Sequence, residues 1–277
     1  MTKIFSVLNL SHESPQKDAY VKSPADAVRK MEILQQGGAD YIDVGARSSF
    51  AKSEPLDDAI ERERLGSFFS FPRAEGLLPL SLDTWSATTA SSFLTQIDVL
   101  NYTSTDFPDT LIKDLVTTRR KVILNYLPAA NPYELRRMSY FPPSTQAIFE
   151  YFKAMLARLE KRGVQVLAID PNLGMWHPDV PEELKPVFQR EIIEAIPNLK
   201  KLAPVFIVAP RTKGVLNVAL VELILSKGID FLRTHDLVSV KELIEKFRRG
   251  AGSAAAVERA EALEPAPKPA STGQSLR

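Results

Sequence analysis

Two kinds of hydrophobic pattern alternate along almost the whole chain. Ile148, Phe152, Met155 and Leu159 recur with the period of a helix, and similar patterns fill the other intervals between short apolar runs. Eight of these runs are typical of buried strands: Ile4–Leu10, Tyr41–Val44, Leu78–Leu82, Val99–Asn101, Val122–Tyr126, Val166–Ile169, Val205–Val208 and Phe231–Arg233. The pattern therefore predicts eight strands that alternate with helices.

Local signals mark where some of these helices begin and end. Pro24 directly follows Ser23, and Ser144 follows two prolines, and both arrangements are typical of helix starts. Glycines stand where helices should pass into the next strand, at Gly37-Gly38, Gly163 and Gly228.

This alternation favours parallel strands, and about 250 residues is the usual size of a closed barrel. We expect an α/β fold, a (β/α)₈ TIM barrel with eight parallel strands, over residues 1–249. A doubly wound open sheet is the alternative, but the sequence has no glycine-rich dinucleotide fingerprint. Residues 250–277 are rich in Ala, Pro, Glu and Ser and contain no aromatic residue, so they are predicted to form a disordered tail.

Composition narrows the range of functions. The 277 residues include 35 Lys and Arg against 34 Asp and Glu, so nothing in the overall charge attracts nucleic acid or a membrane surface. The absence of cysteine excludes disulfides and thiolate catalysis, and three scattered histidines argue against structural zinc. The N-terminus does not resemble a signal peptide and no stretch is apolar enough to span a bilayer, so we expect a soluble cytoplasmic protein.

Polar side chains recur at the carboxyl ends of the predicted strands, where barrel enzymes place their reacting groups. A single one is usually a cap or turn residue, but a polar group at every strand end is harder to explain that way. Carboxylates and amides suit a flat ligand with several N–H and C=O groups, whereas Lys, Arg and His suit a phosphate. The residues concerned are Asn9, Asp43, Asp83, Asn101, Asn125, Asp170, Lys213, Arg233 and His235.

The segments around these residues resemble motifs of the dihydropteroate synthase family, in the same order and with similar spacing. The resemblance extends from Ile4 to about Phe247. It is carried by Ser6–Ser11, Gly38–Gly45 with Ser48-Ser49, Ser81–Thr84, Ala168–Gly174 and Leu232–Leu237.

The resemblance implies a transferase of folate biosynthesis that joins 6-hydroxymethyl-7,8-dihydropterin diphosphate to p-aminobenzoate and releases diphosphate. It implies Mg²⁺ carried with the diphosphate near Asn9, no organic cofactor, and a homodimer, with which the apolar segment Val215–Leu225 is compatible. The implied pterin-binding residues are Asp83, Asn101, Asp170 and Lys213. The implied diphosphate-binding residues are Asn9, Ser49, Arg233 and His235, and the implied catalytic residues are Lys213, Arg233 and His235.

The chain departs from the family pattern mainly where the second substrate binds. Phe50-Ala51 occupies the place of an Arg-Pro pair, Gly45-Ala46-Arg47 that of Gly-Gly-Glu, and Arg211 that of a serine beside the lysine. Arg47, Phe50 and Arg211 are therefore possible acceptor-binding residues.

Three explanations of these departures stay open. Arg47 or Arg211 compensates for the missing arginine in ordinary dihydropteroate synthesis. Alternatively, the acceptor is the ribofuranosylaminobenzene phosphate of tetrahydromethanopterin biosynthesis, with Arg211 on its phosphate. Thirdly, the protein binds a pterin or folate without catalysis. A sugar-phosphate aldolase with Lys213 as Schiff-base former is a function of a different class, although Lys213 falls in a loop past Pro210.

Overall fold

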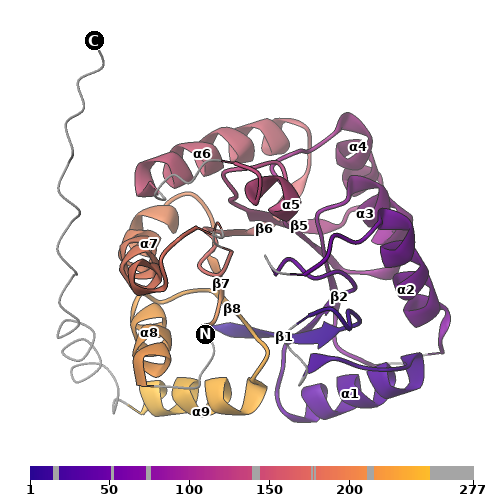
Figure 1. The fold of residues 1–277 in the computed structure, drawn as a ribbon, viewed down its shortest axis with the longest axis horizontal. Coiled ribbons are helices and arrows are strands. Elements are labelled where there is room, and N and C mark those ends of the chain that lie inside the picture. The colour runs from indigo at the N-terminus through magenta and orange to yellow at the C-terminus, as the bar shows by residue number, and fades with distance from the viewer. Residues whose placement is uncertain are drawn as a thin grey trace.

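Eight parallel strands form one sheet that curls into a barrel, and helices form an outer ring around it (Figure 1). This computed structural model describes residues 1–14, 19–50, 53–72, 76–138, 144–175, 177, 179–210 and 215–249. The strand order is β6-β5-β4-β3-β2-β1-β8-β7, and an isolated parallel bridge between Ile169 and Val205 completes the ring. The strands are β1 Lys3–Asn9, β2 Tyr41–Gly45, β3 Leu80–Thr84, β4 Val99–Tyr102, β5 Lys121–Asn125, β6 Gln165–Asp170, β7 Phe206–Val208 and β8 Phe231–Thr234. The predicted TIM barrel is confirmed.

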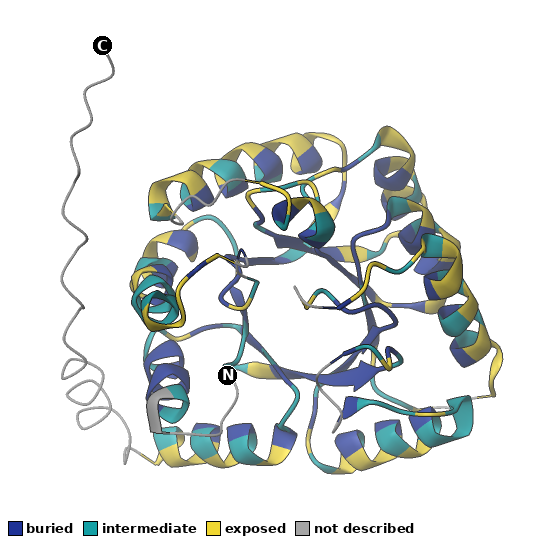
Figure 2. Cartoon of the chain, in the orientation of Figure 1, coloured by how far each residue is buried: buried dark blue, intermediate teal, exposed yellow. Residues whose placement is uncertain are grey.

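The helices bury one face against the strands and expose the other, as the colours of Figure 2 show. Their apolar faces and the outward-facing strand residues form the main hydrophobic core. The helices are α1 Pro24–Gln36, α2 Asp58–Ser70, α3 Ala87–Phe93, α4 Asp109–Thr118, α5 Pro132–Leu135, α6 Thr145–Lys161, α7 Lys185–Leu199, α8 Val215–Ser226 and α9 Leu237–Arg248, with 3₁₀ turns η2 Leu94–Gln96 and η3 Glu182–Leu184.

The predicted helix starts are confirmed by their capping bonds. The Ser23 hydroxyl accepts from the N–H of Asp26 at the start of α1, and the Ser144 hydroxyl accepts from Ala147 at the start of α6.

The third strand was predicted to begin at Leu78, which is wrong, because β3 begins at Leu80. Pro79 has no N–H to give to the sheet, and only its carbonyl oxygen is used, accepting from Ile42.

Apolar side chains fill the barrel interior at the amino ends of the strands. The ring of Phe5 stacks on Tyr41 with centroids 4.2 Å apart and meets Phe206 and Phe231 edge-on at 5.1 and 5.7 Å. Val99, Ile123 and Ala168 complete this buried cluster. The barrel therefore has a closed, apolar floor.

Polar side chains lie directly above this floor, because alternate residues of a strand point to the same face. Each of five residues stands two positions after a residue of the apolar floor and so points into the barrel: Asp43 after Tyr41, Asn101 after Val99, Asn125 after Ile123, Asp170 after Ala168, and Arg233 after Phe231. The fold thus turns a period-two sequence pattern into a polar ring at the carboxyl end.

Within the described part of the chain, no helix combines the length and apolar character needed to cross a membrane. The predicted tail, residues 250–277, lies outside the described residues, so that prediction is untested.

Candidate active site

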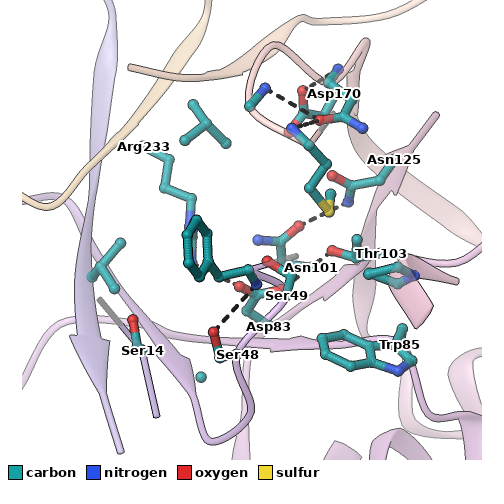
Figure 3. A pocket seen from close by; sticks show the side chains of 18 of the residues that line it. Ser14, Ser48, Ser49, Asp83, Trp85, Asn101, Thr103, Asn125, Asp170 and Arg233 are labelled. Atoms are coloured by element: carbon teal, nitrogen blue, oxygen red, sulfur yellow. Dashed lines mark hydrogen bonds and ion pairs between the residues drawn. The ribbon is translucent and has the colours of Figure 1, made fainter. Parts of the chain in front are cut away.

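A cavity of about 510 Å³ opens at the carboxyl ends of the strands. Figure 3 shows the side chains of Asp83, Asn101, Asn125, Asp170 and Arg233 around it. Asn9, Ser49 and His235 also line it, whereas Asp43 lies fully buried and does not. The predicted strand-end residues within the described chain therefore meet at one place. Lys213 and Arg211 lie outside the described residues, so predictions about them are untested.

Arg233 joins two carboxylates from different strands. Its Nε donates to Asp43 Oδ2 at 2.5 Å, and its Nη2 donates to Asp83 Oδ2 at 2.7 Å. Burial by itself lowers the pKa of Arg233, but the two carboxylates raise it by more. The net effect is a raised pKa, so the side chain is charged. Thr103 donates to the other oxygen of Asp83 at 3.2 Å. The interior therefore holds a cation between two anions, which fixes all three side chains.

Two asparagines extend this network around the barrel. Asn125 Nδ2 donates to Asn101 Oδ1 at 2.9 Å and to the carbonyl of Tyr102 at 3.2 Å. Asn101 Nδ2 in turn donates to Asp43 Oδ2 at 3.2 Å. The amide of Asn101 is thus held from both sides, and Asn125 acts by orienting it. The motif comparison gave Asn125 no such role.

Asp170 is held by the turn that follows β6. It is only 2% exposed, and its Oδ1 accepts from the N–H of Asn172 at 2.8 Å. Asn172 adopts a left-handed conformation with φ of 65°, and its own Oδ1 accepts from the N–H of Met175 at 2.9 Å. Among the described residues, none donates a hydrogen bond to the second oxygen of Asp170, which lines the cavity.

The two cavity carboxyls titrate close to neutral pH. Burial raises the pKa of Asp170 to about 7, opposed by the Asn172 N–H and by Arg233. Burial likewise raises the pKa of Asp83 to about 6, with Arg233 lowering it and Asp43 adding to the rise. Both groups can therefore change between hydrogen-bond donor and acceptor near physiological pH.

This raised pKa makes stability depend on pH. The pKa of Asp170 is about 3.9 in an unfolded chain and about 7 in the folded protein. The folded state therefore holds this proton more tightly than the unfolded chain does. The contribution of Asp170 to the free energy of unfolding is fully present below about pH 4 and is lost as the pH rises through about 7. Asparagine at this position does not titrate. The free energy of unfolding of wild type minus that of Asp170→Asn should fall by on the order of 3 kcal/mol between about pH 4 and pH 7.5.

Urea denaturation at a series of pH values measures this difference. Asp114→Asn on α4, whose side chain is outside the cavity, is the control for the general effect of replacing an aspartate with asparagine. A flat curve for Asp170→Asn would show that folding does not raise the pKa of the Asp170 carboxyl.

Donors for an anion gather on the side of the cavity formed by β1, β8 and the loop after β2. Asn9 is 7% exposed and, within the described structure, its Nδ2 is buried without a hydrogen-bond partner, while its Oδ1 accepts from Ser11. Ser49 and His235 line the same cavity. A buried donor without an acceptor is costly, so Asn9 is suited to an acceptor supplied by a ligand.

The loops after β1 and β2 are tied to each other and to α2. Glu13 accepts from Arg64 at 2.6 Å, and this hydrogen bond is the main reason that the pKa of Glu13 is lowered to about 2. The Ser53 hydroxyl donates to the carbonyl of Glu13 at 3.2 Å. The loop that follows Asn9 and the loop that carries Ser49 are therefore anchored.

Arg47 and Phe50, the other possible acceptor-binding residues, differ in their surroundings. The Arg47 side chain is 3% exposed and lies 2.6 Å from Asp58 and 3.0 Å from Glu61, with its guanidinium 4.0 Å from the centre of the Trp85 ring. Its charge is already balanced within the protein. Phe50 is 45% exposed and lines the cavity. Sequence reasoning missed Trp85, Arg136 and Met175, which also line it, and no motif marked them.

Comparison with known proteins identifies the group to which this barrel belongs. The sequence profile of the family described as pterin binding enzyme matches residues 5–251. The chain belongs to the pterin-binding enzyme family. The dihydropteroate synthase type-3 of Escherichia coli is 24% identical over 263 residues, which cover 88% of this chain and 98% of that protein.

Solved structures of this pterin-binding family have the same fold. Dihydropteroate synthase of Anaplasma phagocytophilum with bound 6-hydroxymethylpterin-monophosphate superimposes with a TM-score of 0.70 at 23% identity, covering 90% of this chain and 98% of that one. The Xanthomonas albilineans enzyme with 4-aminobenzoic acid gives 0.74 at 17% identity, covering 91% and 94%.

These findings confirm the resemblance to the dihydropteroate synthases and the expectation of a transferase of that type. They also remove the support for a sugar-phosphate aldolase. The roles of individual residues remain predictions.

Proposed function

We propose that this protein joins 6-hydroxymethyl-7,8-dihydropterin diphosphate to an aromatic amine, p-aminobenzoate in the first instance, with release of diphosphate. The observation that carries the proposal is the ring of fixed carboxylates and amides above an apolar floor, beside the buried Nδ2 of Asn9, which no acceptor among the described residues pairs with. Such a ring suits a flat, nitrogen-rich heterocycle, and the donor suits the anion attached to it.

The pterin ring is proposed to bind between Asp83, Asn101 and Asp170. Asp170 presents an oxygen that is not used by the turn after β6, and a carboxylate pairs well with a ring N–H and a neighbouring amine. Asn101 is held in one orientation, and Asp83 is held by Arg233 and Thr103. Because these contacts exist before a ligand binds, little ordering is needed on binding. Lys213 is proposed to lie beside the ring.

In the reaction, the amine nitrogen attacks the pterin methylene carbon, the bond from that carbon to the diphosphate oxygen breaks, and the nitrogen loses a proton. Negative charge grows on the leaving diphosphate, so donors fixed around it stabilise the transition state most. Asn9, Ser49, Arg233 and His235 are proposed to surround this group. Arg233 uses Nε and one N–H of Nη2 for Asp43 and Asp83, and its remaining donors are left for phosphate oxygens.

The residues near Asn9 fit a diphosphate better than a metal ion bound directly by protein. The unpaired Asn9 atom is a donor, and no group of three His, Asp or Glu side chains suited to a metal occurs within the described residues. We therefore propose that Mg²⁺ is held chiefly by the diphosphate oxygens, with Asn9 Oδ1 nearby. When bound, it would neutralise charge on the leaving group. The homodimer also remains a proposal.

Release of diphosphate tests the function directly. Purified protein is incubated with dihydropterin diphosphate and either p-aminobenzoate or the ribofuranosylaminobenzene phosphate. Release that depends on p-aminobenzoate supports folate biosynthesis, and release that depends only on the phosphorylated amine supports the tetrahydromethanopterin branch. If neither amine stimulates release while the pterin binds, the protein is a pterin binder and the proposed reaction is wrong.

His235→Ala should separate the binding of diphosphate from that of the pterin ring. We expect the Kd of dihydropterin diphosphate to rise about tenfold or more, because a hydrogen bond to a charged group is lost. The Kd of 6-hydroxymethyl-dihydropterin, which has no diphosphate, should change less than about twofold. Calorimetry with both ligands measures this, and equal losses for the two would place His235 away from the anion.

A further inference from the structure

The arginines that line the cavity differ in how their charge is balanced. Within the described residues, three arginines line it: Arg47, Arg136 and Arg233. Arg47 and Arg233 each lie within 3.0 Å of two carboxylates. Lys185, another cavity cation, pairs with Glu182. Arg136 forms no ion pair with any carboxylate in the described part of the chain, so its positive charge is left uncompensated.

Neutral groups hold the guanidinium of Arg136 in place. Its Nη1 donates to the carbonyl of Ser53 at 2.8 Å and its Nη2 to the carbonyl of Phe50 at 2.5 Å. The guanidinium carbon lies 4.8 Å from the centre of the Tyr133 ring. Arg136 Nε is buried and, within the described structure, has no hydrogen-bond partner.

These contacts orient the charge without cancelling it. A guanidinium has five N–H donors, and the two carbonyls use two of them. Burial lowers the pKa of Arg136, but an arginine stays protonated in a protein. A fixed, partly buried cation with donors to spare is best satisfied by a carboxylate or phosphate.

The cavity wall beside this cation is apolar. Pro132 and Leu135 of α5 line the cavity just before Arg136, and Phe50 and Trp85 line it from the loops after β2 and β3. The Phe50 carbonyl accepts from Arg136, and Trp85 meets edge-on, at 5.1 Å, the Tyr133 ring that faces the Arg136 guanidinium. The guanidinium of Arg47, 4.0 Å from the centre of the Trp85 ring, is already paired with Asp58 and Glu61. The wall therefore suits an aromatic ring whose far end bears a negative charge.

We propose that Arg136 pairs with the anionic group of the arylamine acceptor, carboxylate or phosphate, and so determines which acceptor the cavity selects. This inference rests on the proposed function, because it identifies the class of amine that the same cavity accepts. Arg136 is a specificity-determining residue in this view, and its charge selects the acceptor.

The test compares acceptors that differ in charge at similar shape. Diphosphate release is measured at saturating dihydropterin diphosphate with p-aminobenzoate, neutral p-aminobenzamide, and 4-aminophenyl phosphate. For Arg136→Gln we expect the KM of the preferred anionic amine to rise about tenfold or more. The KM of p-aminobenzamide should stay within about twofold of wild type, because that amine makes no charged contact. The anion with the larger loss identifies whether carboxylate or phosphate is the natural group.

Arg137→Gln is the matched control. Arg137 is the next residue, its side chain is 74% exposed, and it pairs with Glu134 outside the cavity, so its loss should leave every KM unchanged. Equal losses for charged and neutral amines in Arg136→Gln would mean that Arg136 only holds the loop after β2, and the proposal would be wrong. An unchanged KM for both would also refute it.

The role of Arg136 can be tested even if the protein does not catalyse the proposed reaction. If wild-type protein releases no diphosphate with any amine, calorimetry with p-aminobenzoate in the presence of pterin and diphosphate still tests Arg136. Binding by wild type that is lost in Arg136→Gln and kept in Arg137→Gln supports the anion site. Equal binding by the variants, or none by wild type, overturns it.

Discussion

Replacing Arg233 with methionine is expected to lower the free energy of unfolding by about 3–5 kcal/mol at pH 7. The side chain of Arg233 is 12% exposed and contacts Asp43 and Asp83, the first of which is fully buried. Without the guanidinium, two carboxylates remain in the interior that, among the described residues, have no cation beside them and are held only by the neutral donors Asn101 and Thr103. Their desolvation, rather than the lost attraction alone, accounts for most of the expected effect.

Urea denaturation measures this change, and a second substitution identifies its cause. Asp43→Asn combined with Arg233→Met removes one of the stranded charges and should recover part of the lost stability. Arg162→Met removes an arginine whose ion pair with Asp109 at 2.9 Å is exposed, and should cost less than about 1 kcal/mol. A loss in Arg233→Met no larger than in Arg162→Met would show that the interior network contributes little.

Replacing Asp170 with alanine is expected to raise the Kd of a dihydropterin at least about 100-fold. The variant removes the carboxylate oxygen that is proposed to accept from the ring N–H and the neighbouring amine. Because burial raises the pKa of Asp170 to about 7, the comparison belongs at about pH 8, where the carboxylate form dominates. Below that pH, part of the wild-type protein is protonated and its own affinity is lower.

Calorimetry with 6-hydroxymethyl-dihydropterin measures this effect. Asp114→Ala on α4 is the control, because its side chain is outside the cavity, and its affinity should match that of wild type. Undiminished affinity in Asp170→Ala would remove Asp170 from the pterin site.

Much of the fold could be predicted from the sequence because its determinants are local. Buried strands need short apolar runs, and Ser23 and Ser144 cap their helices through bonds that span three residues. The polar ring was also predictable, since a residue two positions beyond a strand's buried side chain points the same way. The misplaced start of β3 shows the limit of hydrophobicity alone, because Pro79 is apolar and yet cannot donate to the sheet.

The chemistry of the cavity was less predictable because it depends on partners distant in sequence. Arg47 looks in sequence like a free cation near the second substrate, yet it is balanced by Asp58 and Glu61 of α2. Arg136 looks like an ordinary surface arginine after a short helix, yet it reaches carbonyls more than eighty residues away and lines the cavity. Charge balance of this kind is visible only once the chain is folded.

The network around Arg233 links stability to function. Asp43 takes no part in lining the cavity but holds both Arg233 and Asn101, two residues that do. Asp43 is therefore a positioning residue, and a substitution there should disturb the pterin site without touching the ligand.

A crystal structure of the protein with bound 6-hydroxymethyl-dihydropterin tests most directly whether the polar ring is the pterin site. The ring is predicted to lie above the Phe5–Tyr41 floor, with the Asp170 carboxylate within hydrogen-bond distance of its N–H groups and with Asp83 and Asn101 at its edge. A pterin bound elsewhere, or one in the cavity that does not contact Asp170, would contradict this prediction.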